Sequence, residues 1–91
     1  MPERTATIAS KSGLHARPAS IFVEEVGRLD LDVTIAAAGD GEALDAASIL
    51  SLMTLGASHG DVVRLRADGP GADEALDHLV GVLETDHDSE A

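Results

Sequence analysis

Pro18 is the residue that most constrains how this chain can fold, because it limits where the surrounding segment can be helical. Proline lacks a backbone N–H, so it is tolerated in the first turn of a helix and disfavoured further along. Downstream of it, apolar residues recur at the i, i+3, i+4, i+7 spacing of one helix face: Ala19, Phe22, Val23 and Val26. The sequence therefore predicts a helix from about Ala16 to Gly27 or Arg28, with Pro18 in its first turn.

The segments around this helix alternate apolar and polar residues, which is typical of strands. We expect strands over residues 4–10, 29–37, 42–45 and 61–67, with a turn at 39–41. In the second strand, the residues expected to face the core are Leu29, Leu31, Val33, Ile35 and Ala37. Ser48, a favoured N-cap, and Gly56, a favoured helix stop, bound a short helix.

A last helix follows Pro70-Gly71, with Asp73 and Glu74 in its first turn. Its apolar face comprises Ala72, Ala75 or Leu76, Leu79 and Leu83. The element order is therefore β-α-β-β-α-β-α. This order suggests an α+β fold with helices on one face of an antiparallel sheet.

Length and charge limit the classes of function open to this chain. Its 91 residues fit one domain, with an ordered core over about 3–84 and a flexible acidic tail over 85–91. A net charge of −11 argues against nucleic-acid binding, and the absence of cysteine excludes thiol chemistry. No apolar run approaches the roughly 20 residues that span a membrane, and residues 1–4 do not resemble a signal peptide. We expect a cytoplasmic protein without membrane insertion, and the acidic composition suggests a salt-loving source as a hypothesis.

His15 and Arg17 lie at the expected mouth of the first helix, where backbone N–H groups and the positive dipole end attract anions. A neutral imidazole can attack an activated phosphoryl group and carry it as a phosphohistidine. Arg17 can meet two phosphate oxygens with its planar fork. Gly13 suits a loop that turns tightly or approaches a ligand closely. The residues thus favour covalent phosphate chemistry at His15.

The segment Gly-Leu-His-Ala-Arg-Pro-Ala-Ser at 13–20, followed by Phe22 and Val23, resembles the active-site segment of HPr, the histidine-containing phosphocarrier of the bacterial sugar phosphotransferase system. Residues 47–57 resemble the family's second signature, a short helix opened by a serine, and residues 60–63 resemble the start of its last strand. The resemblance covers roughly residues 3–84. It implies an open-faced β-sandwich with four antiparallel strands and three helices on one face.

The resemblance also implies a role for each residue of the site. His15 would accept a phosphoryl group on Nδ1 from phosphorylated enzyme I and pass it to a histidine of a IIA domain of a sugar transporter. Arg17 would stabilise the phosphate, with the N–H of Ala16 and the Ser12 hydroxyl as further contacts. The protein would be a stoichiometric carrier and not an enzyme, without cofactor or metal.

Partner docking and regulation follow from the same resemblance. The expected docking residues are Ile49, Leu50 and Met53 on the short helix, with Ala16 and Ser20 on the first; Leu52 and Leu55 are expected in the core. Where well-known relatives often place lysines, this chain has Glu24, Gly27 and Ser51. Ser48 aligns with the serine that an HPr kinase/phosphorylase modifies in some members, although Ala47 replaces the usual lysine before it.

Three other functions are considered beside that of a phosphoryl carrier. A regulatory docking module controlled at Ser48 is the main alternative, and a small hydrolase with His15 as general base ranks last because it lacks a supporting set of residues. A fructose-dedicated or nitrogen-regulatory paralogue is a third. We expect a monomer. His59, His78 and His87 are interpreted as solvated, although Asp86-His87-Asp88 has the residue types of a weak metal site.

Overall fold

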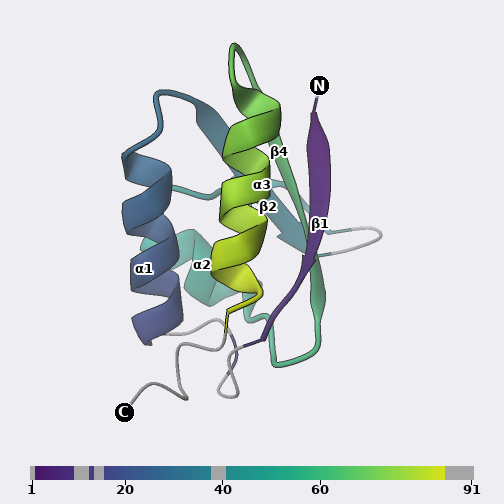
Figure 1. Ribbon diagram of the computed structural model, residues 1–91. Helices are drawn as coiled ribbons and strands as arrows, with labels where there is room; N and C mark the ends of the chain where they lie inside the picture. The colour runs from purple at the N-terminus through teal and green to yellow at the C-terminus, as the bar shows by residue number, and fades with distance from the viewer. Residues whose placement is uncertain (1, 10–12, 14–15, 38–40, 86–91) are drawn as a thin grey trace.

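The computed structural model describes residues 2–9, 13, 16–37 and 41–85, which form seven helices and strands. In chain order these are β1 (Glu3–Thr7), α1 (Ala16–Gly27), β2 (Asp32–Ala37), β3 (Leu44–Asp45), α2 (Ile49–Leu55), β4 (Val62–Asp68) and α3 (Ala72–Leu83). Figure 1 shows the helices packed on one side of the sheet, with α1 and α3 running side by side along it. The predicted element order and α+β fold are confirmed.

The four strands form one antiparallel sheet in the order β1-β4-β2-β3. β4 lies inside the sheet: its Val62 pairs with Thr7 of β1, and its Val63 pairs with Ala37 of β2. Alternate residues of a strand point to opposite faces. The residues of β4 on the helix side are all buried, namely Val63, Leu65 and Ala67. β4 therefore contributes one complete face to the core.

The helices bury the apolar stripes that their spacing predicts. In α1 these are Ala19, Phe22 and Val26, and in α3 they are Ala72, Ala75, Leu76, Leu79 and Leu83. Pro18 is the third residue of α1, within its first turn as expected, and it is buried. Phe22, the only aromatic residue of the chain, is completely buried between α1 and the rest of the core.

β1 is also joined to α3 by polar contacts. Arg4 donates from Nε to Asp77 Oδ1 at 2.9 Å and from Nη2 to Asp73 Oδ1 at 3.2 Å. The backbone N–H of Thr7 donates to Glu84 Oε2 at 3.2 Å. These contacts hold an edge strand that has only one strand neighbour.

Several predicted strand limits are wrong. β1 ends at Thr7 and not at residue 10, because Ile8 and Ala9 donate instead to the carbonyl oxygens of Asp61 and Leu83. β2 begins at Asp32, because the N–H of Leu29 still donates to the Val26 carbonyl at the end of α1. Leu29 and Leu31 nevertheless pack against the core as expected. β3 has two residues where four were predicted, and β4 starts and ends one residue later than predicted.

Ala37 lies opposite the buried Val63 and so is on the predicted face of β2, but it is exposed, whereas Ala36 on the other face is buried. Ala36 lies opposite Arg64 in the register between β2 and β4, so the two side chains share a sheet face. The long Arg64 side chain, itself only 22% exposed, explains why a small alanine beside it is covered. Most of the predicted turn at 39–41 and of the tail at 85–91 lies outside the described residues.

Within the described part of the chain, no helix combines the length and the apolar character that crossing a membrane requires.

Replacing Phe22 with alanine is expected to lower the free energy of unfolding by about 3–5 kcal/mol, because it leaves a cavity in the centre of the core. The measurement is urea unfolding followed by far-UV circular dichroism. Leu50→Ala is the control, since Leu50 is 76% exposed. A loss for Phe22→Ala no larger than that of the control would contradict this placement of the core.

Candidate functional site

The start of α1 carries the cationic part of the candidate site. Arg17 is the second residue of the helix and is exposed, and Ser20, one turn further, is exposed as well. The first turn holds no acidic residue, although the chain as a whole has a net charge of −11. The helix dipole and Arg17 thus act together without a neighbouring carboxylate in that turn. This end of α1 suits an anion.

Two predicted site residues, Ser12 and His15, lie outside the described residues. Ala16 is the first residue of α1, so its backbone belongs to the helical turn from which N–H groups were predicted to meet a phosphate. The roles of these three residues stay predictions from the sequence.

Gly13 lies close to another segment of the chain, whereas the sequence suggested a tight turn or a close approach to a ligand. Its φ of 80° lies in the left-handed region, and it is buried. A Cβ at this position would lie 2.7 Å from the carbonyl oxygen of Ala57 and 3.0 Å from the Cα of Ser58. Gly13 therefore rests directly on the segment after α2, and only a glycine fits at this position.

α2 begins and ends where the sequence predicts. Ser48 is its N-cap, with Oγ accepting from the N–H of Ser51 at 3.3 Å, and Gly56 ends it with a φ of 61°. The predicted separation of its two faces is confirmed: Leu52 is buried, whereas Leu50 is 76% exposed and Met53 40% exposed. Ile49 is 39% exposed, like Met53, and Leu55 is partly buried against the core.

The positions where lysines were expected in relatives are placed at or near the surface. Glu24 is 73% exposed and lies 3.8 Å from Arg28, Gly27 is exposed at the end of α1, and Ser51 is half-buried in α2. These residues leave the helical face without lysine, so it differs in charge from the face that the resemblance implies.

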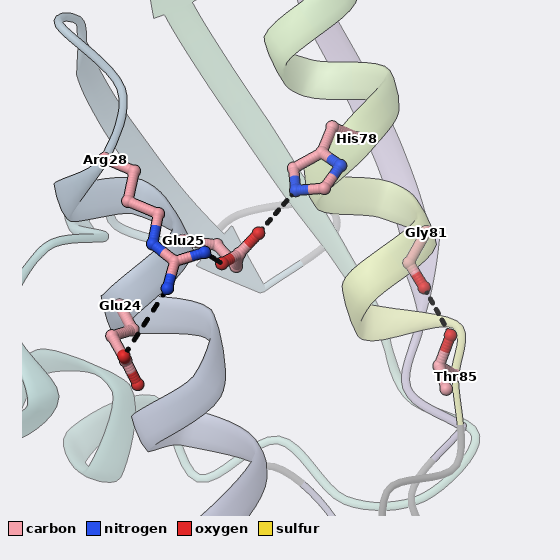
Figure 2. Close-up of polar contacts among 6 residues, drawn as sticks. All are labelled: Glu24, Glu25, Arg28, His78, Gly81 and Thr85. Carbon is pink, nitrogen blue, oxygen red and sulfur yellow. Dashed lines mark hydrogen bonds and ion pairs between the residues drawn. The ribbon is translucent and has the colours of Figure 1, made fainter.

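His78 differs from its interpretation as a solvated residue. Its Nε2 lies 2.6 Å from Glu25 Oε1, which joins α3 to α1, and Arg28 donates to the other carboxylate oxygen at 3.0 Å (Figure 2). The hydrogen bond from His78, with a smaller contribution from the charge of Arg28, lowers the pKa of Glu25 below its ordinary value. The spacing of Glu25 and Arg28 on one helix was readable from the sequence, whereas the His78 contact needs the packing of two helices.

Of the remaining histidines, the structure describes His59 only. His59 is exposed in a turn after α2, as expected, and His87 with its neighbouring aspartates lies outside the described residues. Across residues 2–9, 13, 16–37 and 41–85, no three or more His, Cys, Asp or Glu side chains are grouped so as to hold a metal ion.

Both the structure and the sequence of this chain are similar to those of known phosphocarrier proteins. The structure superposes on a crystal structure of the phosphocarrier protein HPr from Bacillus anthracis with a TM-score of 0.83, at 33% identity, covering 90% of this chain and 95% of that one. The phosphocarrier protein HPr of Haloferax volcanii is 46% identical over 83 residues, which are 91% of this chain and 93% of the relative. The HPr-like protein Crh of Bacillus subtilis is 38% identical over 84 residues, 92% of this chain and 96% of the relative.

The fold is thus that of the open-faced phosphocarrier domains. Residues 2–85 match the family model described as the phosphorylation site of the HPr component of the phosphotransferase system. The chain belongs to the HPr family, whose members act as phosphocarriers in that system, with enzyme I and IIA domains as their general partners.

Replacing Glu25 with glutamine is expected to reduce stability at neutral pH and to weaken its dependence on acid. The folded protein lowers the pKa of Glu25, so the ionised carboxylate stabilises the fold above its ordinary pKa of 4.5, and this contribution is lost as the pH falls through the lower folded value. Thermal unfolding measured from pH 7 down to pH 3 reports the difference between the variant and the unmodified chain.

Glu24→Gln is the matched control, because it removes the same charge from a neighbouring exposed position that makes no contact with His78. If Glu25→Gln and Glu24→Gln gave the same pH profile, the proposed contribution of the α1–α3 contact would be wrong.

Proposed function

We propose that this protein carries a phosphoryl group on His15, receiving it from phosphorylated enzyme I and passing it to a histidine of a sugar-transporter IIA domain. The observation that carries the proposal is the family match over residues 2–85, together with a Gly-Leu-His-Ala-Arg-Pro segment leading into α1. The cationic first turn of α1 supports it on physical grounds. Each protein molecule carries one group per cycle, so it is a carrier and not a catalyst.

The transfer is a nucleophilic substitution at phosphorus. The lone pair of the neutral His15 Nδ1 attacks the phosphorus, a new N–P bond forms, and the bond to the donor atom of enzyme I breaks with its electron pair returning to that atom. The onward step repeats this exchange with the IIA histidine as nucleophile. Arg17 neutralises the charge of the phosphate oxygens, and the backbone N–H of Ala16 and the Ser12 hydroxyl donate to them.

The partner-binding surface is proposed to consist of Ile49, Leu50 and Met53 with Ser20 and Ala16. The exposure of the three α2 residues supports this role, because isolated domains seldom leave three large apolar side chains exposed on one short helix without a use. Methionine adapts to differently shaped partners, as a carrier that meets several IIA domains requires.

The acidic charge of the chain bears on how partners are recognised. Glu24, Gly27 and Ser51 stand where relatives often have lysines that meet acidic grooves on their partners, so electrostatic docking to such a groove would be weakened. The native enzyme I is therefore proposed to carry a compensating surface or to dock in high salt. The composition is consistent with a protein adapted to high salt and acting in the cytoplasm, both of which stay proposals.

A regulatory docking module is the second candidate, favoured by the similarity to the protein Crh. In that case phosphorylation of Ser48 by a kinase would be the main output. The N-cap role of Ser48 already accounts for a serine at this position, and Ala47 stands where a lysine is usual, so we rank the carrier first. A fructose-dedicated or nitrogen-regulatory carrier uses the same residues and shares the chemistry proposed here.

Incubation with phosphoenolpyruvate, Mg²⁺ and enzyme I from the same organism is expected to add about 80 Da, one phosphoryl group, in a form that acid removes, as expected of a phosphohistidine. Intact-mass measurement before and after acid treatment, at low and at high KCl, detects it. His15→Ala is expected to abolish the adduct, and Arg17→Ala to slow its formation by about 10- to 100-fold through lost charge stabilisation.

Lys11→Ala is the control for loss of a neighbouring charge and is expected to retain the adduct. An adduct that persists in His15→Ala, or its absence from the unmodified chain at both salt levels, would contradict the carrier role.

A further inference from the structure

The exposed side of α1 is one stripe of residues that begins at the candidate anion site. Its members, which we call the outer stripe, are all exposed and recur at the i, i+3, i+7, i+10 spacing of one helix face: Arg17, Ser20, Glu24 and Gly27. A helix rises 1.5 Å per residue, so Glu24 lies about 10 Å along the helix axis from Arg17. The outer stripe therefore carries a cation at its start and a carboxylate two turns further along.

Glu24 and Glu25 are neighbours in the chain, but their side chains point in different directions. Glu25 points toward α3, where its carboxylate contacts His78, and Glu24 points away from α3 (Figure 2). The Glu25 side chain is only 20% exposed, whereas that of Glu24 is 73% exposed. One glutamate is thus used inside the fold, between two helices, and the other faces solvent.

The charges around these two glutamates do not balance. Two carboxylates, those of Glu24 and Glu25, lie beside one guanidinium, that of Arg28, which leaves one negative charge. Arg28 donates to Glu25 at 3.0 Å but lies 3.8 Å from Glu24, a distance too long for a hydrogen bond. An exposed ion pair of that length contributes little to stability. The charge of Glu24 is therefore the one that acts outward.

A protein that docks on the start of α1 also covers Glu24. Each side of a typical protein–protein interface buries roughly 800 Å², which reaches well beyond the 10 Å between Arg17 and Glu24. The exposed apolar residues Leu50 and Met53 lie on α2, which packs against α1, so the covered area has apolar side chains as well. A carboxylate within such an area attracts a partner with an opposite charge there and disfavours one with a like charge.

We propose that Glu24 is a specificity-determining residue, which selects a phosphoryl-donor protein that presents a lysine or arginine about 10 Å from its contact with Arg17. The proposal rests on the carrier function proposed above and adds a residue to the partner-binding surface. It assigns the compensating charge of the partner to one place on the helix. Because Glu24 is at the surface, it acts on association and not on the chemistry of transfer.

The test compares Glu24→Lys and Glu24→Gln with the unmodified chain. Asp68→Lys is the control, because Asp68 is exposed at the end of β4 on the face of the sheet opposite the helices, and both lysine variants change the net charge equally. Phosphoryl transfer from enzyme I of the same organism is resolved into kcat and KM, with this protein as the varied substrate. Binding to unphosphorylated enzyme I is measured by calorimetry, and both experiments are done at 0.1 M and at 1 M KCl.

Glu24→Gln is expected to raise KM by about 2- to 5-fold at 0.1 M KCl, and Glu24→Lys by about 5- to 20-fold, both with kcat unchanged. The dissociation constant is expected to change by the same factors. At 1 M KCl, where charges are screened beyond about 3 Å, each effect is expected to shrink several-fold. Asp68→Lys is expected to change KM by less than about 2-fold at either salt concentration. Circular dichroism verifies that each variant is folded.

An unchanged or lower KM for folded Glu24→Lys and Glu24→Gln would overturn the proposal. An equal effect of Asp68→Lys would overturn it as well, since net charge and not the position of Glu24 would then control docking. Failure of the carrier function is distinguishable: the unmodified chain would then accept no phosphate, whereas calorimetry would still report whether Glu24 takes part in binding to enzyme I.

Discussion

Burial of one face of β4 is the constraint on which the rest of this molecule depends. Val63, Leu65 and Ala67 on that face are inaccessible to water, and full burial of a valine or leucine side chain contributes roughly 1.5–3 kcal/mol each. β4 also pairs with two strands, so β1 and β2 are positioned by it. A chain of 91 residues has enough helix to cover one face of such a sheet, and the opposite face carries polar side chains, among them Arg64 and Arg66, which pair with Glu3.

The location of the candidate site follows from this arrangement. Phe22 fixes α1 in the core, so the first turn of α1, with Arg17, reaches the edge of the helical layer. Residues 56–61 connect α2 to β4, and Gly13 lies against Ala57 and Ser58 of this connection. Arg17 is exposed, so an anion bound to its guanidinium would lie at the surface. That suits a carrier, whose group must be reached by one partner and then by another.

Much of the fold could be predicted because single residues determine it locally. Pro18 fixed the start of α1, Ser48 and Gly56 fixed the ends of α2, and the alternation in β4 identified its buried face. The errors have tertiary causes. The end of β1 depends on carbonyl groups of residues 61 and 83, and the burial of Ala36 depends on Arg64 across the sheet.

The sequence placed the candidate site at the start of α1, because the residues of the motif are adjacent and their chemistry is local. Of these residues the structure describes Gly13 and Arg17, and the role of His15 stays a prediction. The contact of His78 with Glu25 and the approach of Gly13 to the turn after α2 could not be predicted. Each joins segments that are far apart in the sequence, so it becomes visible only in the folded structure.

Transfer of the phosphoryl group to a IIA domain distinguishes a carrier from a protein that is only phosphorylated. The phosphorylated protein would be purified away from enzyme I and mixed with a IIA domain from the same organism, and the masses of both proteins would be followed over time. If the protein is a carrier, the IIA domain gains one phosphoryl group, about 80 Da, for each one that this protein loses. Loss of the group to water alone, with the mass of the IIA domain unchanged, would contradict the carrier function.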